Sequence, residues 1–284
     1  MKKIYMTVLI IVTVVCVIGG SIVHGTGLLT RIRHFVGRHT ASESGQIVES
    51  GQGRDYDLSP FTSLKLDVGI GDIRLVTGDG YHLTYSGKDS LAPVLKEDGD
   101  RLKITQNDRN VRSWFKTDNP LDTENTMVIT VPADAKLKDL DAELNMGNFT
   151  ITGISADDTE LSLNMGNLDV MDSSFGKLSV DADLGNVTIR DISADKAEFD
   201  ASMGNIEAVH IADFRSLDLD ADMGNIDLTL DQKLDDLNLA LSASLGSVKI
   251  NGENVSDKKI KNGNGSITVT ADASLGSVDI KTAR

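Results

Sequence analysis

Cysteine, aromatic residues and proline are scarce in this chain. Among 284 residues there is one cysteine, Cys16, and aromatic residues make up 4%. A single cysteine excludes an internal disulfide framework and a cysteine-based zinc site. The five histidines are scattered, and the sequence contains neither a phosphate-binding loop nor a zinc-ligand spacing. No catalytic group of residues stands out, so we predict that the protein is not an enzyme.

Basic residues are scarce outside the N-terminal segment. The chain has 28 Lys and Arg against 43 Asp and Glu, which gives a net charge of −15. Residues 1–40 contain five of the bases and no acid, so the remainder carries a net charge of −20. A domain of this charge is repelled by nucleic acid and by the bare surface of an anionic membrane. We therefore expect no nucleic-acid partner.

An apolar–Gly–Asn unit recurs through the C-terminal half of the chain. The steps between successive glycines are 19, 19, 19, 20 and 22 residues. A nearly fixed period of this size indicates stacked identical units. An earlier copy with the same flanking pattern lies at residues 62–77. We assign these glycines and asparagines to a structural corner column: Gly71, Gly147, Asn148, Gly166, Asn167, Gly185, Asn186, Gly204, Asn205, Gly224, Asn225 and Gly246.

Apolar and polar residues alternate on both sides of each corner glycine. Counted from the glycine, positions −7, −5, −3, +2 and +4 are mostly apolar, and Asp, Ser, Asn, Glu and Thr lie between them. Alternation with period two is typical of a strand buried on one face. The pattern predicts an all-β fold, a single-stack β-solenoid with coils of about 19 residues and two strands per coil. A β-sandwich of hairpins is the rival, because Gly-Asn also suits a hairpin turn.

Two further columns and the last repeat carry structural predictions. Methionine or leucine precedes most corner glycines, and we interpret this column as gap-filling core residues. The asparagines that follow the glycines are expected to form a ladder of stacked amides. Gly265 and Gly276 are only 11 residues apart, which predicts a shortened capping coil at the C-terminal end.

Acidic residues share one outward column. Asp181, Asp200 and Asp220 occupy position −4 of successive repeats and should lie about one layer apart. Like charges directly opposite each other destabilise a sheet, so solvent, interspersed Asn and Ser, or a divalent cation should offset their repulsion. We assign these three residues to a candidate binding surface. No cofactor is expected, and calcium remains the alternative.

One polar, non-repetitive segment interrupts the pattern at residues 106–125. It contains Trp114 and Phe115 between two bases. An exposed aromatic pair on a loop would be a contact site for a partner or a glycan. Alternatively, the pair closes the open end of the solenoid core. Both residues join the candidate binding surface.

The N-terminal segment predicts a membrane anchor. Residues 4–23 contain no charge, and 20 apolar residues span a hydrocarbon core as a helix. A cleaved signal peptide is the alternative. The predicted organisation is an anchor at 1–27, a basic juxtamembrane segment and flexible tether at 28–57, and the repeat domain at 58–284. Within that domain 58–133 is irregular and 134–284 is regular. We expect a single-pass protein of the cell membrane with the repeat domain outside the cell.

The anchor, the Gly71-Asp72 strand pair, a strand ending at Pro132 and the Gly-Asn or Gly-Ser corners together resemble a known bacterial group. It is the membrane-anchored β-strand-repeat domain of unknown function called "putative adhesin", to which the LiaG-like envelope-stress proteins are similar. The resemblance covers roughly residues 60–284. It implies a non-catalytic envelope protein for adhesion, binding or scaffolding, with an envelope protein or a cell-wall glycan as partner. The alternatives are a polysaccharide-active β-helix enzyme and a membrane-linked regulatory module of a stress-sensing system.

Overall fold

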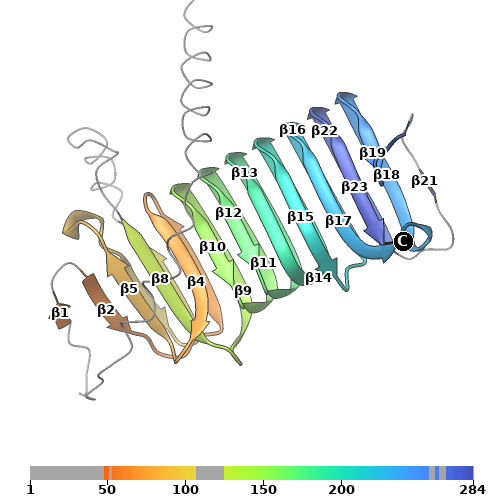
Figure 1. Cartoon of the computed structure of the whole chain (residues 1–284). Coiled ribbons are helices and arrows are strands. Elements are labelled where there is room, and N and C mark those ends of the chain that lie inside the picture. The colour runs from red at the N-terminus through yellow and green to blue at the C-terminus, as the bar shows by residue number, and fades with distance from the viewer. Residues whose placement is uncertain (1–47, 51–52, 107–124, 256–259, 262–266, 284) are drawn as a thin grey trace, which may run out of the picture. The chain divides into compact units, whose positions relative to one another are not determined.

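The computed structural model describes residues 48–50, 53–106, 125–255, 260–261 and 267–283. These residues form an all-β stack (Figure 1). Within them, no helix combines the length and the hydropathy that a membrane span requires. The predicted anchor at 1–27 and the aromatic pair Trp114 and Phe115 lie outside the described residues.

The strands line up on two sides of the stack, which we call side 1 and side 2. In spatial order, side 1 consists of β6 (Val94–Asp98), β7 (Arg101–Thr105), β3 (Ser63–Val68), β9 (Lys136–Met146), β11 (Ser155–Met165), β13 (Ser174–Leu184), the later part of β14 (Val187–Met203), β16 (Ser216–Met223), β22 (Ile267–Leu275), β18 (Leu237–Leu245) and β21 (Ile260–Lys261).

Side 2 consists of β1 (Val48–Ser50), β2 (Gly53–Asp57), β5 (His82–Ser86), β8 (Thr126–Pro132), β4 (Asp72–Gly78), β10 (Phe149–Thr152), β12 (Leu168–Met171), the start of β14, β15 (Ile206–Ala212), β17 (Ile226–Lys233), β23 (Val278–Ala283), β19 (Val248–Ile250) and β20 (Glu253–Asn254). Two short 3₁₀ turns, η2 (Asp89–Leu91) and η3 (Leu234–Asp236), complete the described elements.

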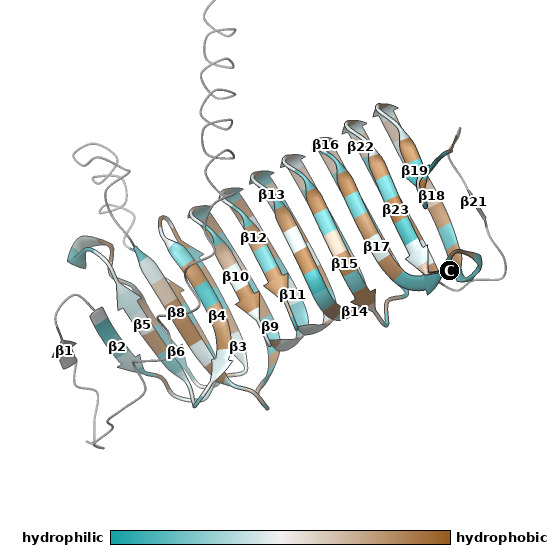
Figure 2. Cartoon of the chain, viewed as in Figure 1, coloured by the Kyte–Doolittle hydropathy of each residue, from teal (hydrophilic) through white to brown (hydrophobic). Residues whose placement is uncertain are grey.

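Successive repeats pair in parallel and in the register of the period. Leu161 of β11 pairs with Val180 of β13, and Val180 pairs with Phe199 of β14. On side 2, Leu168 likewise pairs with Val187. Parallel neighbours at a constant step exclude the sandwich of hairpins, because hairpin strands pair antiparallel. The alternating apolar bands of Figure 2 mark the side chains that point into the stack.

The core runs along the whole stack between the sides. The inward residues at −5, +2 and +4 are buried, except for the partly buried Val248, and Phe199, Val187 and Ile189 have no exposed surface. Burial of such a side chain contributes about 1.5–3 kcal/mol. No single coil could bury both of its apolar faces alone, so the fold depends on stacking.

The coils of Gly147, Gly166, Gly185 and Gly204 have a third inward-facing segment that the prediction of two strands per coil missed. Ile192 and Ala194, at +7 and +9, are buried although the sequence suggested a loop there. Before this segment two consecutive residues point outward, which shifts the alternation by one position. The second of them, Asp191, has a positive φ of 53°. The two inward residues that follow this left-handed residue form a short third side of the coil.

Close approach between layers explains the corner glycines. A Cβ atom on Gly204 would lie 1.7 Å from the carbonyl oxygen of Gly185, and one on Gly224 would lie 1.6 Å from that of Gly204. The same obstruction recurs from Gly147 to Gly276. Positive φ adds a second requirement at Gly147, Gly166 and Gly185 but not at Gly204. The stacking distance, more than the turn, demands glycine.

The asparagines next to the glycines form a hydrogen-bonded ladder. Asn205 donates its backbone N–H and its side-chain amide to Oδ1 of Asn186, at 3.0 and 3.2 Å. The same pair of bonds joins each asparagine to the layer before it. The ladder begins at the carboxylate of Asp72 and ends at Ser277 and Ser247. Each corner is thereby tied to its neighbours by side chains as well as by backbone.

The order of coils in space departs from their order in sequence at both ends. The last coil, β22 and β23, lies between the β16–β17 coil and the β18–β19 coil. At the other end, β3 and β4 lie between β9–β10 and the later coil β7–β8. The predicted capping role of the Gly276 coil is therefore wrong. Outside the exchanged coils, antiparallel strands β6, β5, β20 and β21 close the stack.

The column that precedes the corner glycines is exposed, which corrects its interpretation as core filling. Met165 is 41% exposed, Met223 45%, Leu275 47% and Leu245 71%. The chain turns at the glycine, so the side chain before it lies at the outer corner of the coil rather than between the sides.

We predict that Gly204→Ala destabilises the stack by about 3 kcal/mol or more, because the new methyl group meets backbone of the next layer. The φ angle of Gly204 is not positive, so the change isolates layer contact from backbone strain. Thermal and denaturant unfolding of the full chain measure the effect.

Gly53→Ala is the matched control, because its Cβ would make only an ordinary contact 3.8 Å from the carbonyl oxygen of Tyr85. If both variants unfold within about 0.5 kcal/mol of the parent protein, layer contact does not account for the glycine column.

Candidate functional site

Parallel pairing turns the polar positions of side 1 into rows that run along the stack. Residues at −8, −6 and −4 point outward because they alternate with the buried ones at −7, −5 and −3. Each layer adds one side chain to each row, about 4.8 Å from the last. A row is thus a linear array of side chains whose chemistry is set by one position of the repeat.

The row at position −4 is an unbroken line of four aspartates. Asp181 pairs with Asp200, Asp200 with Asp220, and Asp220 with Asp272. The structure brings together the three residues that the sequence placed in this row and adds Asp272. The last was missed because the Gly276 coil was assigned to the end of the stack rather than to a place beside β16. We call these four residues the aspartate row.

Neighbouring carboxylates surround the aspartate row. Glu198 and Asp218, at position −6, pair with each other on adjacent strands. Asp183 and Asp222 lie two residues beyond Asp181 and Asp220 and are exposed. No ion pair within 4.0 Å joins a residue of the row to a base among the residues that the structure describes.

Burial and neighbouring charges raise the pKa of two residues of the row, Asp200 and Asp220, and of the nearby Asp218. Partial burial raises the pKa of Asp200, and the charges of Glu198, Asp220, Asp181 and Asp218 raise it further. Partial burial and then Asp272, Asp222 and Asp218 raise the pKa of Asp220. The pKa of Asp218 is raised by burial and by Glu198. Like charges held one layer apart thus leave repulsion that the described residues do not neutralise.

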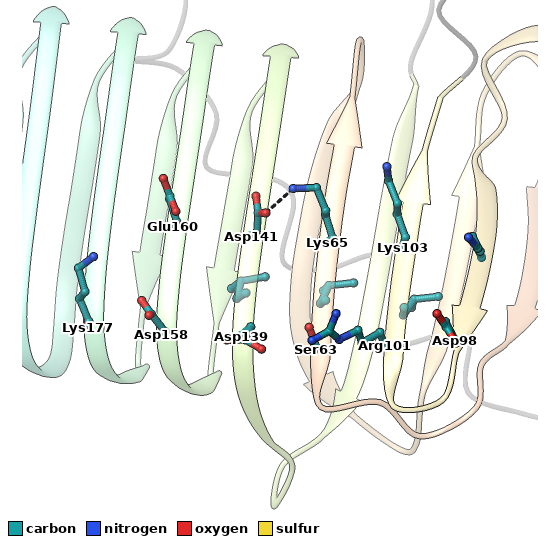
Figure 3. Close-up of a pocket in the computed structure, with 14 residues that line it drawn as sticks. Ser63, Lys65, Asp98, Arg101, Lys103, Asp139, Asp141, Asp158, Glu160 and Lys177 are labelled. Atoms are coloured by element: carbon teal, nitrogen blue, oxygen red, sulfur yellow. Dashed lines mark hydrogen bonds and ion pairs between the residues drawn. The ribbon is translucent and has the colours of Figure 1, made fainter.

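The opposite end of side 1 is basic. Lys96 pairs with Lys103, and Lys103 pairs with Lys65, all at position −6 of their layers. Lys65 contacts Asp141 of β9 by an ion pair (Figure 3), which raises the pKa of its ammonium group. No described carboxylate lies within ion-pair distance of Lys103.

A shallow hollow of about 510 Å³ lies over this basic end. Lys65, Lys103 and Arg101 line one part of it, and carboxylates of β9 and β11 line the other (Figure 3). Those carboxylates belong to Asp139, Asp141, Asp158 and Glu160. The hollow therefore lies where bases of β3 and β7 meet acids of β9 and β11, and Lys177 of β13 lies at its far edge.

Side 2 lacks this segregation. Arg190 pairs with Glu207 at 3.0 Å, and Lys249 stands beside Asp279 in the register of β19 and β23. Burial raises the pKa of Asp169, but Arg190 opposes the shift. Side 2 also has acids in three adjacent layers, Glu207, Asp227 and Asp279, but Arg190 pairs with the first of them and Lys249 stands beside the last.

This geometry suits non-covalent binding. Among the described residues, no group of three or more His, Cys, Asp or Glu side chains is arranged to hold a metal ion. The row's carboxylates stand side by side, one per layer, rather than converging on one point. The corner column of glycines and asparagines is occupied by contacts between layers.

Comparison with solved structures gives likenesses of fold. A "putative adhesin" from Bacteroides fragilis has a TM-score of 0.51 at 18% identity, over 84% of this chain and 98% of that one. A "putative cell adhesion protein" from Clostridium sporogenes has a TM-score of 0.41 at 16% identity, over 82% and 99%. A "putative lipid binding protein" from Parabacteroides distasonis has a TM-score of 0.44 at 17% identity, over 82% and 96%.

Among curated proteins none matches the sequence. The family described as Toastrack DUF4097 matches residues 61–212 and, in a second overlapping alignment, residues 135–281. Together these alignments span most of the chain and all of its regular repeats. The chain belongs to the Toastrack DUF4097 family.

Proposed function

We propose that this protein is a non-catalytic binding module of the cell envelope, and that side 1 is its binding surface. The observation that carries the proposal is the aspartate row, four carboxylates in register without a described basic partner. A partner that supplies positive charge along the row would relieve repulsion that the folded chain otherwise retains.

The partner that this surface fits best is a basic segment of another envelope protein. The row is linear, so an extended or flexible cationic segment can contact several layers at once. Long-range attraction to an acidic surface also raises the rate of encounter and is weakened by salt. The solved relative from Bacteroides fragilis, named a "putative adhesin", agrees with a binding role.

Envelope location rests on the sequence of the N-terminal segment. The uncharged residues 4–23 would anchor the chain in the cell membrane, and the repeat domain would face outward. A module so placed serves adhesion or scaffolding, including scaffolding during envelope stress. A cell-wall glycan is the second class of partner, and the mixed charges around the hollow at Lys65 and Asp141 are the feature that suits it.

Calcium is the alternative ligand of the aspartate row. Calcium binds carboxylate oxygens at about 2.3–2.6 Å, so an ion midway between two layers about 4.8 Å apart could contact both. Calcium binding would also screen the repulsion. A rise in the melting temperature at millimolar calcium, lost in the row variant described below, would favour this alternative.

Partial burial of carboxylates in and beside the aspartate row, together with repulsion between them, makes stability depend on pH. The folded pKa values of Asp200, Asp218 and Asp220 lie above the ordinary 3.8, so between these values the folded chain binds more protons than the unfolded one. The free energy of unfolding should therefore rise as pH falls through that window. His210, whose pKa is raised by Asp231, acts in the same sense at higher pH.

We predict that Asp200→Asn stabilises the protein at pH 7 by a few tenths of a kcal/mol to about 1 kcal/mol, because it removes one of the opposed charges. It should also flatten the rise in stability between pH 7 and pH 4. Melting temperatures over this pH range, at low and high salt, measure both effects. Asp235→Asn, an exposed acid of η3, is the control. A loss of stability for Asp200→Asn at pH 7 would contradict the electrostatic account.

The binding role is tested with a basic peptide, decalysine, and the full chain. The row variant changes all four residues of the aspartate row to Asn: Asp181, Asp200, Asp220 and Asp272. This change should weaken the binding of decalysine at least tenfold at low salt. The matched control changes Asp227, Asp279, Asp235 and Asp236 to Asn, which alters net charge equally and should change affinity by less than twofold.

Equal losses in the two quadruple variants would mean that only net charge matters, and the proposal would fail. A parent chain that binds decalysine only weakly but is retained on purified cell-wall sacculi would point to a glycan partner. If the row variant is not retained, the surface would be assigned to a glycan instead.

A further inference from the structure

An exposed apolar ridge follows one outer corner of the stack. We call it the corner ridge; it consists of the residues before the corner glycines, in spatial order Met146, Met165, Leu184, Met203, Met223, Leu275 and Leu245. Four of these side chains are 41–71% exposed. Each pairs with the next across adjacent strands, so the ridge is continuous over seven layers.

In the layer next to Met146, the position before the corner glycine is covered by another side chain. Ile70 occupies the same place before Gly71, yet it is only 6% exposed. It packs with Leu91 of the 3₁₀ turn η2, and the amide of Gln106 bonds to its backbone. In that layer the chain covers its own corner with an apolar side chain. Met146 of the following layer packs against the same two residues, and beyond it Met165, Met223, Leu275 and Leu245 are exposed.

Uncharged side chains border the corner ridge. The columns at −2 and +1 contain 14 residues, of which only Asp183 and Asp222 are charged: Asn145, Asn164, Asp183, Ser202, Asp222, Ser274, Ser244, Asn148, Asn167, Asn186, Asn205, Asn225, Ser277 and Ser247. On a chain of net charge −15, this corner is where another copy can approach with little like-charge repulsion.

The spacing of the ridge selects its partner. Its side chains repeat about every 4.8 Å, over about 29 Å in seven layers. A helix repeats every 5.4 Å or so, and over six steps it would drift by about 3.6 Å, most of a layer. A strand laid along the ridge presents one face about every 6.7 Å and drifts faster. A second copy of the ridge has the same repeat and can stay in register throughout.

We propose that two copies of this chain associate side by side through the corner ridge, with the Met and Leu side chains of one interdigitating with those of the other.

A ridge one residue wide predicts a weak dimer. Stable interfaces bury about 800 Å² per partner, which a line of seven side chains does not reach. Flexible methionine side chains suit such a surface because they adapt to a partner. Association should therefore be concentration-dependent in solution.

Sedimentation velocity of the full chain in non-ionic detergent tests the proposal. Met165→Lys with Met223→Lys should weaken self-association at least tenfold. Thr188→Lys with Thr229→Lys, on side 2, is the matched control and should leave it within twofold. Both pairs of substitutions change the net charge of the chain by the same amount. A loss of self-association confined to the ridge variant therefore cannot arise from the change in net charge. A monomer at all concentrations, or equal losses in both variants, would overturn the proposal.

Disulfide cross-linking in a Cys16→Ser background tests contact along the ridge. Asn145→Cys should cross-link to itself if the two copies run parallel, or to Ser244→Cys if they run antiparallel. Failure of both cross-links would overturn the proposal. Binding of a monomeric chain to neutral phosphatidylcholine vesicles, lost in Met165→Lys, would replace the second copy with a membrane surface.

Discussion

The contact between glycines of successive layers is the constraint on which the structure depends. With about 1.7 Å between each carbonyl oxygen and the position a Cβ would take, corners can stack at the strand spacing only if no side chain stands there. That spacing keeps the strands of the stacked coils in parallel register. Register then places every position of the repeat in a straight column, whether the column is apolar core, asparagine ladder, aspartate row or corner ridge.

The ends of the stack need a different solution from its middle. A regular coil always exposes one unpaired edge, which invites association with other sheets. Here the chain exchanges the order of its coils at both ends and adds antiparallel strands beyond them. Gln106 and Asn125 serve the same purpose at the first corner, where both donate to the carbonyl oxygen of Ile70. With its ends closed in this way, the stack directs contacts to its sides and corners.

The sequence predicts what repeats and misses what breaks the repeat. The period and the alternation around each glycine identify the strands, the core positions and three residues of the aspartate row. Neither reveals that the Gly276 coil lies beside β16, because spatial order depends on which long connection folds back. The Met column was misassigned because alternation assumes a straight strand, and the glycine corner turns that side chain outward. The third side was missed because left-handed Asp191 and His210 shift the alternation by one residue.

Regularity also favours some functions over others. A catalytic site needs unlike groups aimed at one point, whereas a stack repeats like groups along a line. The stack offers many copies of the same contact. A weak contact at one layer recurs at the next without further ordering of the chain. Several layers together can therefore hold a partner that one layer cannot. The aspartate row applies this to charge, and the corner ridge applies it to apolar contact. The two occupy different columns of the same repeat, so a chain joined to its copy along the corner would still present its row, and pairing would double the number of rows available to a single partner.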